Sequence, residues 1–265
     1  MMAPTRREFL IIAVFSAIGV VYPPLGRMIS VKADAPPLAG TALPGAPGSV
    51  PALKAKRWAM VVDAKQCSDE CTDCMTACHD EHNVPTIGNP MHEVKWIWPE
   101  RFENVFPAES NPYIQETVRK QIIPVLCNHC DNPPCVRVCP TGATFRRADG
   151  IVMMDSHRCI GCKICLAACP FGARSINFVN PRPFIRKLNP DFPTRTKGVI
   201  EKCNFCEERL ARGLLPACVL ACKEKALVFG DVDDPRSDVR QILDKIFSIR
   251  RRAELGTKPQ VYYIL

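Results

Sequence analysis

The sequence lacks the features that identify most enzymes. It contains no glycine-rich phosphate loop, no catalytic triad and no molybdenum-type site, so nothing in it predicts catalysis by the chain alone. The apolar run at 10–22 is thirteen residues long and ends at Pro23-Pro24, short of the roughly twenty residues that a spanning helix needs. Aromatic residues are also scarce, at 7% of the chain. These absences predict a non-catalytic protein whose core does not rest on aromatic packing.

Cysteine, by contrast, is abundant. The third group of cysteines reads C-x2-C-x2-C-x3-C-P and ends at Pro170, which is the bacterial ferredoxin run for a 4Fe–4S cluster. In that run three thiolates bind one cluster and the fourth binds the other cluster of a pair. Four such groups predict four 4Fe–4S clusters and an electron-transfer role. The sixteen cysteines form four quartets: Cys67, Cys71, Cys74 and Cys78; Cys127, Cys130, Cys135 and Cys139; Cys159, Cys162, Cys165 and Cys169; Cys203, Cys206, Cys218 and Cys222.

Two other uses of sixteen cysteines compete with this one. Disulfide frameworks belong mainly to short secreted domains, whereas this chain has 265 residues. Structural zinc explains C-x2-C pairs, but zinc ribbons place two pairs far apart rather than four cysteines within about a dozen residues. The histidines at 79, 82, 92, 129 and 157 are not needed as ligands, because no quartet lacks a cysteine.

The cluster loops repeat within the chain. The motif Cys-Pro-x-Gly-Ala occurs at 139–143 and again at 169–173, and a third copy without the proline occurs at 222–226. Strands are predicted at 58–63 and 226–229, and a hairpin at 145–154 turns at Asp149-Gly150. The outer quartets are therefore expected to pair with each other, as are the inner two. This predicts an α+β fold of two bacterial-ferredoxin-like domains related by a pseudo-twofold axis.

At these motifs the chain resembles a known family. The runs 127–135, 159–170, 201–206 and 216–218 resemble the four-cluster iron–sulfur subunits of membrane oxidoreductases, such as the dimethyl sulfoxide and polysulfide reductases. The resemblance covers about residues 55–230, and the first quartet departs from it by one extra residue in C-x3-C. With the ferredoxin rule, it implies that ligands are exchanged between quartets. The implied sets are Cys67, Cys71, Cys74 with Cys222; Cys203, Cys206, Cys218 with Cys78; Cys127, Cys130, Cys135 with Cys169; and Cys159, Cys162, Cys165 with Cys139.

The C-terminal stretch narrows the resemblance. Residues 230–235, a helical stretch near 239–246 and the tail 254–264 resemble the DsrO subunits of the DsrMKJOP complex of dissimilatory sulfur metabolism. This implies a NrfD-type integral membrane quinone-interacting subunit, a multihaem cytochrome c and further membrane redox subunits as partners. Three functions stay open: an electron-transfer subunit in sulfur respiration, the equivalent subunit of a nitrite or polysulfide system, and a stand-alone iron–sulfur storage or sensor protein.

The N-terminus predicts the compartment independently. Arg6 and Arg7, followed by Phe9 and Leu10, form a twin-arginine signal, which exports proteins that have already folded around their clusters. We therefore expect the protein at the extracytoplasmic face of the membrane. Ala33-Asp34-Ala35 resembles a cleavage site, but Pro36 follows it directly, so the signal is expected either to be cleaved there or to persist as a tether.

The expected organisation follows from these motifs. The net charge of +8 would be offset by about −8 from four oxidised clusters, so nucleic acid is not expected as a partner. A small-molecule substrate is not expected either, because no catalytic constellation is present in the sequence. The expected parts are a signal at 1–35, a Pro/Ala/Gly linker at 36–55, an outer ferredoxin-like domain at 56–126 plus 200–230, an inner one at 127–180, a connecting loop at 181–199, and a C-terminal helix and tail at 231–265.

Overall fold

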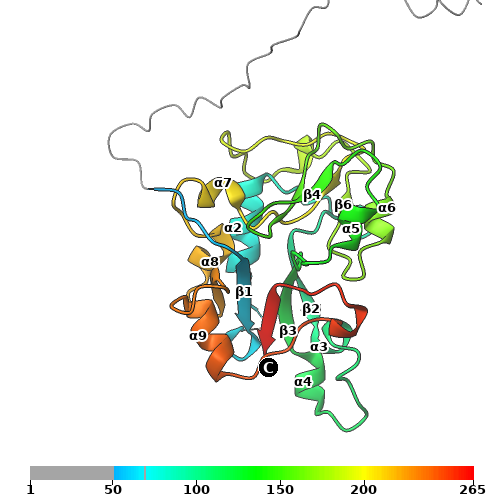
Figure 1. The fold of residues 1–265 in the computed structure, drawn as a ribbon. Coiled ribbons are helices and arrows are strands. Elements are labelled where there is room, and N and C mark those ends of the chain that lie inside the picture. The colour runs from blue at the N-terminus through cyan, green and yellow to red at the C-terminus, as the bar shows by residue number, and fades with distance from the viewer. Residues whose placement is uncertain (1–50, 69) are drawn as a thin grey trace, which may run out of the picture. The chain divides into compact units, whose positions relative to one another are not determined.

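The computed structural model describes residues 51–68 and 70–265. Its largest sheet has three strands, with β1 (Trp58–Asp63) in the centre. β8 (Leu227–Asp231) pairs with β1 antiparallel, and β9 (Val261–Ile264) pairs with it parallel, so the first and last strands lie side by side (Figure 1). The unbroken apolar run of β1 suits a strand buried on both faces. The strands predicted at 58–63 and 226–229 are confirmed, and β9 is an addition to them.

Three two-stranded sheets complete the strand set of the described residues. The predicted hairpin is confirmed, because β4 and β5 pair antiparallel and Gly150 lies between them at a φ of 87°, which favours glycine. The other pairs join segments that are distant in sequence. The strands are β2 (Ile97–Arg101) with β3 (Ile122–Leu126), β4 (Thr144–Arg146) with β5 (Val152–Met154), and β6 (Ser175–Ile176) with β7 (Ile200–Glu201).

The helices are short, and most of them lie beside the cysteine quartets. The longest, α2 (Asp73–His82), packs against α8 (Ala217–Ala221), which brings the first quartet to the fourth. α9 (Asp238–Lys245) packs on β8 and confirms the helix expected near 239–246. The remaining ones are α3 (Phe102–Val105), α4 (Glu116–Lys120), α5 (Pro134–Arg137), α6 (Ile164–Ala167) and α7 (Glu207–Leu210), with 3₁₀ turns at Ala64–Gln66, Arg182–Phe184 and Ala253–Leu255.

The internal repeat is visible in the loops around α5 and α6. Each helix ends two residues before the last cysteine of its quartet, and the glycine three residues later donates its N–H to that cysteine's carbonyl at 3.4 Å. Those glycines, Gly142 and Gly172, have φ of 64° and 63°. In the third copy Lys225 takes the same left-handed place, at 54°. The strand pairing is not repeated, because β1 pairs with β8 whereas β3 pairs with β2 and β6 with β7.

The main hydrophobic core lies between the central sheet, α2 and the β2–β3 pair. Contrary to the expectation from composition, this core relies on aromatic packing, with seven buried aromatic side chains: Trp58, Trp96, Phe102, Phe106, Phe205, Phe229 and Tyr263. Trp58 stacks on Phe229 at 4.9 Å between ring centroids, and Phe205 meets Phe229 edge-on at 5.1 Å. Cysteines from three of the quartets also belong to this core. Among the described residues, none of the helices is both long and apolar enough for a membrane crossing.

Candidate metal centres

The structure gathers the sixteen cysteines into four sites, and each site takes three cysteines from one quartet and one from another. All sixteen are free thiols. Such mixed groups are possible because α2 packs on α8, which brings the first quartet to the fourth, and α5 packs on α6, which brings the second to the third. We name the sites A to D: A holds Cys67, Cys71, Cys74 and Cys222; B holds Cys78, Cys203, Cys206 and Cys218; C holds Cys127, Cys130, Cys135 and Cys169; D holds Cys139, Cys159, Cys162 and Cys165.

Site A lines a cavity of about 250 Å³ beside the first turn of α2. Burial raises the pKa of Cys67 to about 11, and the neighbouring Cys222 and Cys71 thiols add to the effect. Burial likewise raises the pKa of Cys74 to about 12, with Cys67 and Cys222 adding to it. Cys71 is exposed at the edge of the cavity. Site A is therefore a thiol-lined hollow that opens to the surface.

Site B is the most enclosed of the four, because all of its cysteines are buried. Burial raises the pKa of Cys203 to about 12 and that of Cys218 still further. Cys206 adopts a left-handed backbone, at a φ of 53°. Backbone N–H groups of Phe205 and Ala217 donate to the Cys203 and Cys206 sulfurs, each at 3.4 Å. Such N–H donors stabilise a negatively charged sulfur.

Sites C and D lie on the repeated loops. In site C, burial raises the pKa of Cys130 to about 12, and the Cys127 thiol adds to this. In site D, the partial burial of Cys139 acts against ionisation, yet hydrogen bonds from the backbone N–H groups of Thr144, Thr141 and Ala143 and from the Thr141 hydroxyl lower its pKa overall. Cys162 of site D is exposed.

The four sites form a row. Thiols of neighbouring sites are close enough to affect each other's pKa. Burial raises the pKa of Cys78 in site B most, the other thiols of site B come next, and Cys74 of site A adds a smaller increase. Cys127 of site C raises the pKa of Cys203 of site B, second only to burial. Cys135 of site C raises the pKa of Cys165 of site D, after burial and the opposing effect of Arg174. The order is therefore A, B, C, D, and the exposed thiols lie only at its two ends.

The donor sets fit 4Fe–4S clusters. Burial and mutual repulsion disfavour the thiolate forms of these cysteines, so a positively charged metal core would offset the cost of ionising them. Four cysteine thiolates are the ligand set of a 4Fe–4S cluster. Bound there, each cluster would carry one electron at a time.

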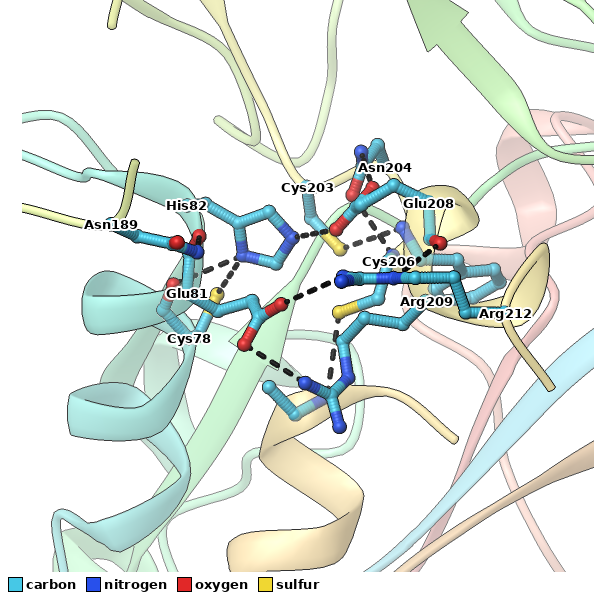
Figure 2. A network of polar contacts seen from close by, with 12 residues as sticks. Cys78, Glu81, His82, Asn189, Cys203, Asn204, Cys206, Glu208, Arg209 and Arg212 are labelled. Atoms are coloured by element: carbon cyan, nitrogen blue, oxygen red, sulfur yellow. Dashed lines mark hydrogen bonds and ion pairs between the residues drawn. The ribbon is translucent and has the colours of Figure 1, made fainter. Parts of the chain in front are cut away.

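A network of polar contacts lies beside site B (Figure 2). His82 lies over Cys78, with its Nδ1 3.0 Å from the Cys78 carbonyl oxygen and its Nε2 2.8 Å from Glu208 Oε1. Burial would raise the pKa of the Glu208 carboxyl, but its hydrogen bond with His82 lowers that pKa overall. Glu81 in turn accepts from Arg209 at 2.8 Å. His82, Cys206 and Glu208 could also hold a metal ion geometrically, but Cys206 already belongs to site B.

Several buried charged residues beside the sites have no clear signal in the sequence. Arg174 reaches the thiols of sites C and D, and Lys202 donates to the carbonyl oxygens of Val152 and Cys203. The one hint is their nearness to a cysteine: Lys202 precedes Cys203, and Arg174 is five residues after Cys169. Arg6 and Arg7 lie outside the described residues.

The sequence matches known proteins along most of its length. Two models described as a 4Fe-4S dicluster domain match residues 118–180 and 158–227. The chain is 38% identical to the Hdr-like menaquinol oxidoreductase iron-sulfur subunit 1 of Archaeoglobus fulgidus, over 98% of this chain and 97% of that protein. It is 35% identical to a tetrathionate reductase subunit of Salmonella typhimurium, over 89% and 84%. It is 32% identical to the menaquinone reductase iron-sulfur cluster-binding subunit of Nitratidesulfovibrio vulgaris, over 78% and 88%.

Proposed function

The chain belongs to the family of 4Fe–4S iron–sulfur subunits of multi-subunit oxidoreductases, and on that basis we propose that it relays electrons through four clusters in a row. As a member of this family it holds several 4Fe–4S clusters and transfers electrons within a menaquinol-linked complex. The finer proposal is that all four sites hold a cluster and that electrons enter at one end of the row and leave at the other.

The observation that carries this proposal is the position of the exposed thiols. Cys71 in site A and Cys162 in site D are exposed, whereas sites B and C have no exposed cysteine. A relay must meet its partners at its two ends and be shielded from solvent between them. A storage or sensor protein has no need of this arrangement, so the row favours the relay.

The proposed ligand sets are the four sites themselves. The arrangement of the cysteines supports the exchange of Cys78 with Cys222 and of Cys139 with Cys169 between quartets. The outer domain, 56–126 plus 200–230, would then hold the clusters of sites A and B. The inner domain, 127–180, would hold those of sites C and D, so that two ferredoxin-like domains arose by duplication. The loop conformation at Gly142 and Gly172 in the inner domain is repeated at Lys225 in the outer domain, which supports that origin.

We further propose where the relay operates. Relatives named for menaquinol oxidation and menaquinone reduction support a membrane quinone-interacting partner, for which we propose a NrfD-type subunit, with a multihaem cytochrome c and other redox subunits beyond it. We place the protein at the extracytoplasmic face of the membrane, exported through Arg6 and Arg7. The pathway we propose is sulfur respiration of the DsrO type. Equivalent subunits of tetrathionate or nitrite systems fit the comparisons equally well, since one relative is a tetrathionate reductase subunit.

The test is electron entry from quinol. The complex is purified with its membrane partner, and a menaquinol analogue is added while the electron paramagnetic resonance signals of the clusters are followed. The relay predicts that the signals change and that removal of the membrane subunit abolishes the change. Clusters that stay silent in the intact complex, or that respond equally well in the isolated chain, would rule it out.

A further inference from the structure

Arg174 is a buried cation without a carboxylate partner. Its side chain is 5% exposed, and its Nη1 donates to the Thr144 hydroxyl oxygen at 3.0 Å. Within the part of the chain that the structure describes, no acidic side chain forms an ion pair with it. By contrast, two other buried arginines are paired, Arg57 with Asp131 and Arg195 with Glu201. Since burying an unpaired charge is costly, some other negative group must compensate Arg174.

The surroundings of Arg174 place it beside the cysteines of two sites. Its Nη1 also lies 3.8 Å from the Met154 sulfur, and its Nη2 has no hydrogen-bond partner within the described residues. Thr144 and Met154 line one pocket together with the four cysteines of site D. Met154 also packs against the buried cluster that contains Cys135 of site C and Cys165 of site D. Burial would lower the pKa of Arg174, but the nearby cysteine sulfurs raise it overall, which fits their compensating its charge.

The position of Arg174 is fixed by the fold. It lies between the repeated loop that ends site C, at Cys169, and strand β6. Its hydrogen bond to Thr144 ties it to the first residue of β4, which follows the loop of Cys139. The guanidinium is a rigid, planar group, so the bond from Nη1 to Thr144 also fixes where Nη2 points. Because Nη2 is unpartnered among the described residues, it leaves a buried donor available to a cluster beside it.

We propose that Arg174 is a positioning residue for electron transfer, whose fixed positive charge raises the reduction potentials of the clusters in sites C and D together. Each one-electron reduction adds one negative charge to a cluster, and a nearby cation stabilises the reduced form more than the oxidised form. A cation near both sites raises both potentials, so it eases electron entry into this half of the row and leaves the difference between the two clusters largely unchanged. The inference rests on the proposed cluster content, which iron analysis of each variant checks separately.

The experiment compares three substitutions in the purified holoprotein. Arg174→Met removes the charge and the donors, Arg174→Gln removes the charge but keeps a donor, and Arg174→Lys keeps the charge. Reduction potentials are measured by chemical titration with mediators, using the electron paramagnetic resonance signals of the clusters. The matched control is Arg158→Gln, because Arg158 adjoins Cys159 of site D but its side chain is 66% exposed and therefore screened by water.

For Met and Gln we expect two of the four clusters to become at least about tenfold harder to reduce, which is about 59 mV for a one-electron couple. Arg174→Lys should keep the potentials close to those of the wild type. Arg158→Gln should change the equilibrium constant for reduction of any cluster less than threefold. If Arg174→Met does not load its clusters, the comparison of Gln with Lys decides the question. Unchanged potentials at full iron content, equal potentials in Gln and Lys, or an equal shift of all four clusters would overturn the proposal. These titrations use no quinol, so their outcome is independent of the quinol test.

Discussion

Cys74 and Cys78 lie one helical turn apart on α2, yet their thiols belong to different sites. Cys74 faces Cys67 and Cys222 in site A, and Cys78 faces the cysteines of site B. Residues four apart in a helix lie on the same face, a few ångströms from each other. A single helix therefore brings two neighbouring sites close together and links one end of the row to its interior.

The first prediction concerns metal content. After anaerobic purification the protein should contain about sixteen iron and sixteen acid-labile sulfide per chain, because each of the four sites has a complete set of cluster ligands. Iron and sulfide assays with protein quantification measure this. Stoichiometric zinc in place of iron would contradict it, since four thiolates also suit zinc.

The second prediction concerns the exchange of ligands between quartets. Cys222→Ser should perturb the same cluster signal as Cys71→Ser, because Cys71 and Cys222 lie in site A. Cys78→Ser should instead match Cys206→Ser, since both belong to site B. The spectra of the four variants are compared under identical reduction. If Cys78→Ser resembles Cys71→Ser, the cysteines of the first quartet bind a single cluster and the exchange is wrong.

The third prediction uses two glycines with the same backbone conformation. Gly161 and Gly172 have φ of 67° and 63°, but a Cβ on Gly161 would collide with the Gly198 carbonyl oxygen, whereas one on Gly172 meets nothing within 4 Å. Gly172→Ala should cost only about 1–2 kcal/mol, for the left-handed conformation. Gly161→Ala lies inside the loop of site D and should cost more, with loss of iron from that site. Urea midpoints and iron content measure both, and equal effects would count against the close contact.

The fourth prediction is export. Replacing Arg6 and Arg7 with Lys should leave folded, cluster-loaded protein in the cytoplasm, because a receptor reads the twin-arginine signal and the fold does not depend on it. Fractionation with iron analysis measures the distribution. Unchanged export would show that the pair is incidental. Partial export would indicate transport together with a partner that carries its own signal.

Sequence reasoning reached the parts of the fold that local chemistry specifies. The turn at Gly150, strand β1 and helix α9 all carry their own signals in a few consecutive residues, and each is present in the structure. The sequence predicts only a tail at 261–264, although Val261 to Ile264 forms a parallel strand beside β1. Whether this segment pairs depends on whether the rest of the fold leaves one edge of β1 unpaired, and no local sequence pattern encodes that.

The candidate site divides in the same way. The cysteine spacing predicted which residues could hold clusters, because ligand spacing is a local property. It gave no sign of Arg174 or of the contact between His82 and Glu208, which are 126 residues apart. Burial turns such residues from ordinary surface charges into groups that act on a cluster, and burial is known only from the fold. The row of sites likewise depends on how the segments that carry the four quartets pack against one another.

The measurement that tests the central claim most directly is electron entry from quinol, followed cluster by cluster. In the complex containing the membrane partner, a menaquinol analogue should change the signals of the clusters in all four sites. Of the two variants Cys71→Ser and Cys162→Ser, the one at the entry end should silence the other three clusters, and the one at the exit end should leave them responsive. If the other three clusters respond equally in both variants, a relay through the row is contradicted.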